Sequence, residues 1–232
     1  MSVFLLSALA ASAAAADLQL GLGYGHVEQL DQHQSPLRYS GNRLRPTVGA
    51  QRLWDGAAMW GRLDLGMGAL GAAGYPDRGV DAAPHLDLRV HTGATARVAT
   101  AGQVRLELGG GLREDFRFGL MALHPWGLNL ASVDLIAAAR APLAQGQLSV
   151  ELALPVAGLI SRHVWSLDPV DPDRGDVGAF FNQGTSPTWL GQLFAPAARV
   201  AWQAPVGDRG RSLVLAADAS WLSYPDPEPI RM

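Results

Sequence analysis

The chain lacks several residue types and patterns that mark common protein classes. Its 232 residues include no cysteine, which excludes disulfides, thiolate metal ligands and cysteine nucleophiles. Lysine is also absent, so arginine and histidine supply all the basic side chains. Past the N-terminus no apolar run approaches the roughly eighteen residues that a membrane-spanning helix needs. A helical membrane protein is therefore not expected.

Charge is sparse as well. Charged residues make up 17% of the chain and the formal net charge is −3, with no basic block. Because nucleic-acid binding depends on clustered positive charge, no nucleic-acid partner is expected. Gly21, Gly23 and Gly25 imitate part of a dinucleotide fingerprint, but no helical pattern follows them. We interpret them as close-packing positions in a strand and expect no cofactor.

The first sixteen residues differ from the rest. Val3 to Leu9 is a short apolar core, and Ala14 to Ala16 before Asp17 satisfies the rule for signal-peptide cleavage. The basic residues that usually precede such a core are missing. We predict a signal peptide over residues 1–16 and one domain over residues 17–232.

Past Asp17 the dominant period is two, which is typical of strands with one apolar face. The clearest segment is His85–Val98, where one row is apolar or small and the other carries His85, Asp87, Arg89 and His91. Eight more segments alternate in this way, at 18–24, 44–51, 62–67, 104–113, 128–139, 148–154, 194–202 and 213–221. The apolar row changes phase near Ser132, which predicts a bulge.

Short and long connections alternate between these segments. Short turns are expected at Asp55–Gly56, Thr100–Gln103, Pro142–Gly146 and Val206–Gly210. Longer loops are expected at 31–42, 72–83, 117–125 and 161–187. Short turns at one end and long loops at the other are the habit of transmembrane barrels.

In this alternation the chain resembles the small outer-membrane β-barrel superfamily of bacteria, which includes the OmpA-like barrels. The resemblance covers nearly all of residues 17–232 and implies an all-β, antiparallel up-and-down transmembrane barrel. It also implies residence in the bacterial outer membrane with lipid as a partner. On this basis Leu86, Leu88, Val90, Leu106, Leu108, Val150 and Leu152 should face outward.

The inward row is rich in charge. Small barrels fill their interior with interlocking side chains of opposite sign. We therefore expect a lumen charge network of Arg62, Asp64, Arg89, Arg105, Glu107, Arg113, Asp115 and Glu151. His85, Asp87 and His91 are candidates for general acid–base catalysis, since His and Asp share one strand. A tight turn centred on Thr100 would set Asp87 opposite Arg113 and His85 opposite Asp115.

An acidic loop and a run of three glycines are two further features of the sequence. Asp168, Asp171, Asp173 and Asp176 crowd the loop 161–187 and could hold Ca²⁺, but Asn182 stands where an EF-hand needs Glu. We favour a solvated acidic loop, and expect any extracellular ligand to bind there. Gly109–Gly111 suggests a sharply curved strand, or room left for bulky neighbours.

Three functional readings stay open. The leading one is a non-enzymatic structural or interaction barrel with a lumen filled by side chains. The second is an outer-membrane enzyme that acts on lipid or peptide. The third is a soluble periplasmic β-sandwich, in which the apolar rows would face each other.

The strand count predicts an open seam. Nine alternating segments are visible, whereas bacterial single-chain barrels normally have an even number. Three prolines within Pro225–Met232 indicate that this stretch cannot supply a strand. We expect about ten strands in the complete protein and unpaired backbone groups between the first and ninth segments.

Overall fold

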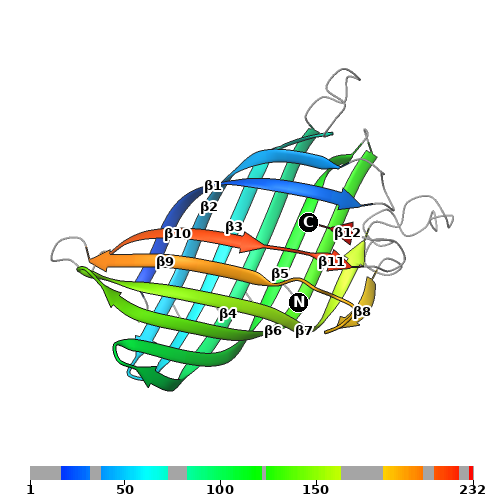
Figure 1. Cartoon of the computed structure of the whole chain (residues 1–232). Helices are drawn as coiled ribbons and strands as arrows, with labels where there is room; N and C mark the ends of the chain where they lie inside the picture. The colour runs from blue at the N-terminus through cyan, green and yellow to red at the C-terminus, as the bar shows by residue number, and fades with distance from the viewer. Residues whose placement is uncertain are drawn as a thin grey trace.

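The fold is that of the computed structural model, which describes residues 17–31, 38–72, 83–121, 124–162, 185–205, 212–224 and 230–231 (Figure 1). These ranges hold nine longer strands: β1 (Asp17–Asp31), β2 (Tyr39–Trp54), β3 (Ala57–Ala72), β4 (Ala83–Ala101), β5 (Val104–Met121), β6 (His124–Leu143), β7 (Gly146–Arg162), β9 (Ala197–Pro205) and β10 (Ser212–Ser220). They also hold three short ones: β8 (Thr185–Trp189), β11 (Ser223–Tyr224) and β12 (Ile230–Arg231). No helix in these ranges is long and apolar enough to cross a membrane.

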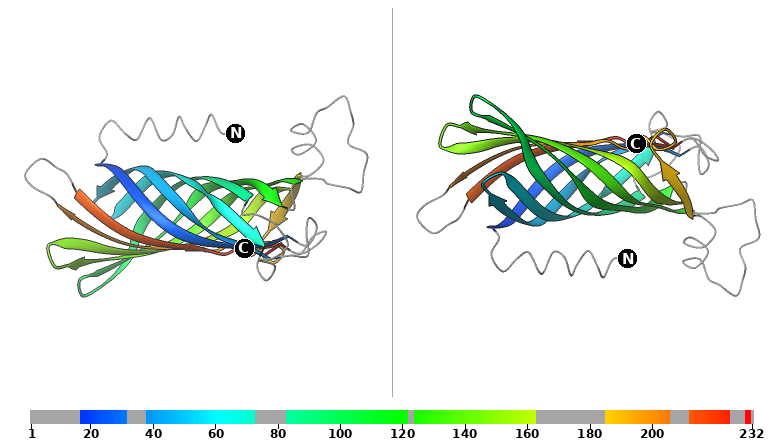
Figure 2. Two further views of the ribbon diagram at one scale, coloured as in Figure 1. Left: turned by 90° about the horizontal axis from the view of Figure 1, so that it is seen from above. Right: turned by 90° about the horizontal axis from the view of Figure 1, so that it is seen from below.

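The long strands form one antiparallel up-and-down sheet that curls into a nearly closed barrel (Figure 2). Neighbours in the sheet follow the order β10-β9-β7-β6-β5-β4-β3-β2-β1. The short strand β8 pairs with residues 157–161 of β7. The predicted fold class is confirmed. The sandwich alternative is wrong, because a single sheet curls around its own interior instead of two sheets facing each other.

Tight turns join the strands at one end of the barrel. The turns at 55–56, 102–103 and 144–145 are present, with positive φ at Gly56, Gly102 and Ala144. The predicted turn Val206–Gly210 lies outside the described residues. The predicted loop 117–125 is wrong, because β5 continues to Met121 and β6 starts at His124. We call the end with the tight turns the turn end and the opposite one the loop end.

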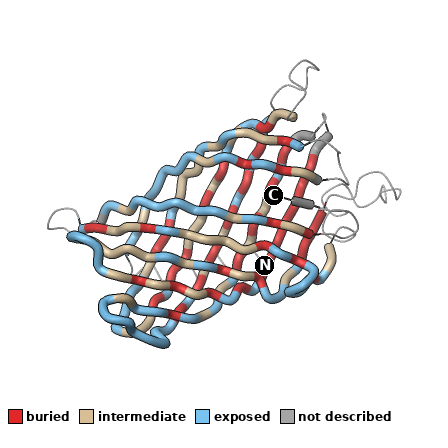
Figure 3. Tube along the Cα trace, viewed as in Figure 1, coloured by how far each residue is buried: buried red, intermediate tan, exposed pale blue. Residues whose placement is uncertain are grey.

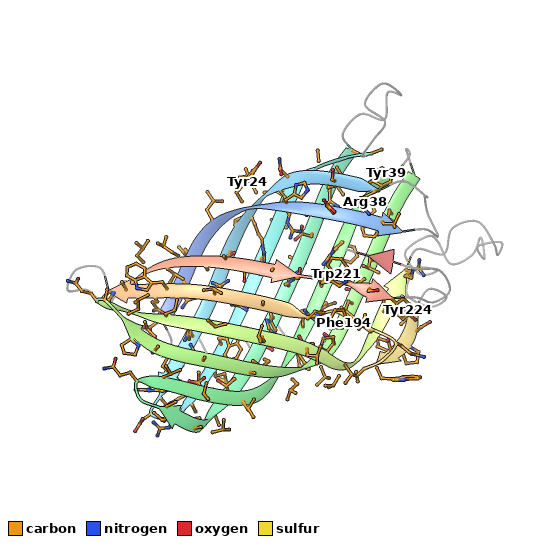
Figure 4. The ribbon with its side chains drawn as sticks, in the orientation of Figure 1. Tyr24, Arg38, Tyr39, Phe194, Trp221 and Tyr224 are labelled. Carbon is orange, nitrogen blue, oxygen red and sulfur yellow. The ribbon has the colours of Figure 1, made fainter. Side chains whose placement is uncertain are left out.

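Every long strand carries large apolar side chains that are exposed. Buried and exposed residues alternate along much of the sheet (Figure 3). Of the seven side chains expected to face outward, Leu86, Leu88, Leu106, Leu108, Val150 and Leu152 are exposed and Val90 is half-buried. Tyr24, labelled in Figure 4, is 72% exposed on β1. Such a surface is compatible with a membrane location.

The loop end of the barrel is filled by an apolar plug. Its buried residues are Val27, Tyr39, Leu70, Trp126, Leu128, Leu130, Ile160, Leu193, Ala195, Leu222 and Tyr224. Four of them come from the segments 190–196 and 221–224, which hydrogen-bond to each other between Phe194 and Ser223 (Figure 4).

The bulge predicted near Ser132 has a counterpart in the pairing of β6 with β7. The register shifts between Val133 and Asp134, and the extra residue is Val156 of β7. The change of apolar row in β6 has another cause. Leu128 and Leu130 point inward into the apolar plug, whereas Val133 and Leu135 are exposed.

The seam between β1 and β10 has no ladder among the described residues. Only at the loop end is it bridged, where β12 pairs with β1 on one side and with β11 on the other. The expectation that Pro225–Met232 supplies no strand is therefore wrong for Ile230 and Arg231. The absence of a tenth full-length strand from the sequence stays a prediction.

Candidate functional site in the barrel interior

Alternation along the strands places charged side chains inside the barrel. We call the following set the ionic network: Arg43, Arg45, Arg62, Asp64, Asp87, Arg89, Arg113, Asp115, Arg117, Asp134 and Glu151. Its centre is Asp115, whose side chain is only 5% exposed. Asp115 Oδ2 lies 2.9 Å from Arg89 Nη2 and 2.8 Å from Arg117 Nη2. One buried carboxylate thus forms an ion pair with each of two guanidinium groups, so neither cation is buried without an acidic partner.

A second centre is Asp134 on β6. Its Oδ2 lies 3.2 Å from Arg113 Nε, and its Oδ1 accepts a 2.7 Å hydrogen bond from the Ser132 hydroxyl. Arg113 also donates to the carbonyl oxygen of Ala195 at 2.7 Å. Since Ala195 belongs to the apolar plug, this bond ties the ionic network to the segment that fills the loop end.

The remaining pairs extend across the interior. Arg62 of β3 donates to Glu151 of β7 at 3.1 Å, which joins strands that are not neighbours. Arg89 of β4 donates to the Ser220 hydroxyl of β10 at 3.1 Å. Two further carboxylates, Asp64 and Asp87, are paired with Arg45 and Arg43. Buried charges are paired throughout the ionic network, and this is the pattern of a packed interior.

Little open space is left around Arg62 and Glu151, in the middle of the ionic network. The two spaces that adjoin both of these side chains have volumes of about 40 and 20 Å³. A single water needs roughly 10–15 Å³ of such free volume, so each space has room for a few waters at most. The interior around Arg62 and Glu151 is therefore filled.

Glycines provide room for the bulkiest inward side chains. A Cβ on Gly93 would stand 2.6 Å from Trp60 Cζ2, and one on Gly111 would stand 2.7 Å from Ile136 Cδ1. The reading of Gly109–Gly111 as room for bulky neighbours is thus confirmed at Gly111. The close-packing reading is wrong for Gly21, Gly23 and Gly25, where an added Cβ would meet only ordinary contacts of 3.5 Å or more.

Most residues of the predicted charge network meet inside the barrel. Arg62, Asp64, Arg89, Arg113, Asp115 and Glu151 belong to the ionic network, and Glu107 pairs with Arg140 at 3.1 Å nearer the turn end. Arg105 does not join them, because it is exposed close to the turn at 102–103. Sequence reasoning missed Arg43, Arg45, Arg117, Asp134 and Arg140, although Arg45 and Asp134 lie within the predicted segments 44–51 and 128–139.

The predicted cross-strand register is wrong. Asp87 lies opposite Arg117 rather than Arg113, and His85 lies opposite Gly119 rather than Asp115. The turn lies at residues 102–103 instead of being centred on Thr100, and the irregularity between Arg97 and Ala99 reduces the resulting offset by one residue. Opposite charges still meet in the actual register, as Arg89 faces Asp115.

The catalytic candidates are buried among these groups. His85 Nε2 lies 3.8 Å from Asp87 Oδ2, beyond hydrogen-bond reach, and His85 stacks on Trp126. His91 Nδ1 lies 3.3 Å from Arg62 Nη2, and its ring meets Trp60 edge-on. The three side chains are at most 5% exposed, so a substrate would have to displace the packed interior to reach them. Their arrangement favours packing over catalysis.

The metal candidates Asp168, Asp171, Asp173 and Asp176 lie outside the described residues, as does most of the loop 161–187. Within the described ranges no three His, Asp or Glu side chains are placed to hold a metal ion.

Comparison with known proteins adds no relative: no family model, no curated protein and no solved structure matches this chain.

Proposed function

We propose that this protein is a β-barrel of the bacterial outer membrane with a non-enzymatic, structural or interaction role. The observation that carries the proposal is that charged side chains are buried and large apolar side chains are exposed, the reverse of the arrangement in water-soluble proteins. Charged residues such as Arg113, Asp115 and Asp134 are nearly inaccessible, whereas large apolar side chains cover the outside of every long strand. Proteins dissolved in water keep charge outside and apolar side chains inside.

The height of the apolar surface fits a bilayer. On β4 the outward row runs from Leu86 to Val98, twelve steps along the strand. At roughly 3.4 Å per residue and a tilt of about 45°, these steps span about 29 Å. Barrels of the outer membrane present an apolar band of roughly 25 Å. The match supports lipid as the surrounding medium.

The packed interior supports a closed barrel rather than a pore. The ionic network crosses the lumen through the Arg62–Glu151 pair, and the apolar plug lies between it and the loop end. We place partner contacts on the long connection between β7 and β8, within the loop 161–187. Loops carried on a rigid scaffold are where binding residues concentrate.

The proposal is tested in two ways, by the location and gel migration of the protein and by its conductance after purification. The chain is expressed with its N-terminal residues, the cell envelope is fractionated, and the protein is run on gels with and without heating. We expect recovery with the outer membrane and a band that migrates differently when unheated, because the folded barrel resists detergent. Recovery in the soluble periplasmic fraction would overturn the membrane proposal.

The second readout is ion conductance after reconstitution into planar bilayers. A lumen filled by the ionic network should give no steady single-channel current. A stable open channel in the unmodified protein would overturn the closed-barrel part while leaving the membrane part intact.

A further inference from the structure

A single charged side chain interrupts the apolar rows on the outside of the barrel. On β5 the outward row runs from Leu106 to Phe118, and Glu114 stands within it. Its cross-strand neighbours are Val90 on β4 and Ala131 on β6. No other described outward residue of β3, β4, β5, β6 or β7 is acidic or basic. Glu114 is therefore an isolated charge on an apolar surface.

Glu114 lies well inside the apolar surface rather than at its border. On the same row Phe118 is four residues nearer the loop end, and Leu106 is eight residues nearer the turn end. At roughly 3.4 Å per residue and a tilt of about 45°, these steps are about 10 Å and about 19 Å along the barrel axis. Lipid headgroups lie outside the apolar band of a barrel, so a cation in a headgroup would not reach this carboxylate.

The carboxylate of Glu114 has no polar partner in the described part of the chain. It forms neither a hydrogen bond nor an ion pair there, whereas the next residue, Asp115, pairs with two arginines inside the barrel. Ionisable side chains that face lipid are costly, and they mark sites where a partner group binds. The complementary partner is a cation. A second copy of the chain that docked through β3 to β7 would bring none, because the described outward rows of these strands carry no basic residue.

An apolar hollow adjoins Glu114 on the side toward the turn end. Its volume is about 470 Å³, and its lining comes from β3, β4, β5 and β6. Gly61, Ala94 and Gly110 are small members of the outward rows there, and on β5 Leu112 separates the hollow from Glu114. Pockets for small ligands have volumes of roughly 300–1,000 Å³ and are mostly apolar with a few polar groups. The hollow and the carboxylate together match this description.

The order of these features along β5 fits a molecule with one polar end. From the loop end toward the turn end, the outward row presents Glu114, then Leu112, then Gly110 in the hollow. A group bound at Glu114 can thus extend an apolar chain into the hollow, toward the middle of the apolar surface. Thr92, which is paired with Leu112 and lines the hollow, adds a hydroxyl oxygen as a further acceptor. An ammonium group has three donors and can use both acceptors.

We propose that Glu114 and the hollow form a binding site for an amphiphilic amine. Its ammonium group pairs with the Glu114 carboxylate, and its alkyl chain lies over Ala94 and Gly110. A plain acyl chain would leave the carboxylate unpaired, and a small cation without a chain would leave the hollow empty. The site rests on the proposed membrane function in one respect, because that function makes lipid the medium around Glu114.

The probe for this site is dodecylamine that carries a photoreactive diazirine at the end of its chain. A primary amine of this kind is protonated at neutral pH, as lysine is. The purified protein in nonionic micelles is mixed with the probe and irradiated, and the labelled residues are located by mass spectrometry. We expect the labels to concentrate around the hollow, near Ala94 and Gly110. Labels spread evenly around the barrel would mean adsorption to the apolar surface and would overturn the proposal.

Two comparisons test the charge. Glu114→Gln should lower labelling of the hollow about tenfold at low probe concentration, a factor that corresponds to about 1.4 kcal/mol. Glu28→Gln is the matched control and should change nothing, because Glu28 is an exposed carboxylate on β1, outside the strands that line the hollow. An alcohol with the same chain and diazirine should label the unmodified protein about tenfold less than the amine does. Equal labelling of E114Q and the unmodified protein, or by amine and alcohol, would overturn the proposal.

Two further measurements test the chain site and a competing occupant. Ala94→Leu fills the hollow and leaves Glu114 in place, so it should also lower labelling, and undiminished labelling would overturn the proposal. Light scattering of the protein in micelles gives its oligomeric state, which we expect E114Q to leave unchanged. A dimer that dissociates in E114Q would instead assign Glu114 to a contact between two copies. All variants are required to keep their heat-dependent gel migration, so that failure of the amine site leaves the membrane proposal standing.

Discussion

The barrel interior has two parts of opposite chemistry that lie next to each other. The ionic network is built by side chains that alternate along the strands, with Asp115 between Arg89 and Arg117. The apolar plug also uses strand residues, but segments 190–196 and 221–224 complete it with Leu193 and Leu222. The two meet where Arg113 donates to the carbonyl of Ala195.

The contrast shows two ways to close a lumen. The ionic network depends on charge compensation, so each member is costly to remove alone. The apolar plug depends on packing, so the loss of one side chain leaves a cavity without leaving an unpaired charge. Substitutions in the two parts should therefore differ in size and in kind.

The largest effect is expected in the ionic network. Asp115→Ala leaves Arg89 and Arg117 buried without their shared carboxylate, and should lower the free energy of unfolding by about 3–5 kcal/mol. The measurement is urea unfolding of the micelle-embedded protein, followed by tryptophan fluorescence. Asp55→Ala is the control, because the Asp55 side chain is 87% exposed at a turn and its loss should not register. Equal stability of the two variants would show that water reaches the ionic network.

A smaller effect is expected in the apolar plug. Ile160 is fully buried, and Ile160→Ala should lower the free energy of unfolding by about 3 kcal/mol through lost burial and a residual cavity. The neighbouring Leu159 is 42% exposed on the outside, so Leu159→Ala loses no enclosed packing and should cost less. The same unfolding experiment compares them. If both variants lose the same amount, the plug is not tightly packed.

The smallest effect concerns the border of the ionic network toward the turn end. Gly93→Ala places a Cβ 2.6 Å from Trp60 Cζ2 and 2.8 Å from Ile136 Cδ1, and should cost about 1–2 kcal/mol by overpacking. Gly71→Ala on β3 is the control, because nothing lies within 4 Å of its added Cβ. An unchanged transition for Gly93→Ala would mean that Trp60 moves freely in the lumen.

The ionic network was more predictable than the apolar plug. A period of two over His85–Val98 requires that His85, Asp87, Arg89 and His91 share one face, and the outward leucines determine which face that is. The apolar plug has no comparable periodic pattern in the sequence. Leu193 and Leu222 lie in short segments between strands. They pack in the same cluster as Ile160 only because these segments fold over the loop end of the barrel.

The sequence by itself determined the all-β fold, the outward apolar rows and the inward charge, because alternation is a property of a single strand and needs no neighbour. The tertiary structure alone decided which charges meet. The pairing of Asp87 with Arg43 rather than Arg113 depends on turn position, on the irregularity at Arg97–Ala99 and on the curvature of the sheet. The open seam was also decided by the tertiary structure alone, because the sequences of β1 and β10 alternate like those of the other strands. Only closure of the barrel reveals that β1 and β10 run in the same direction and leave space between them.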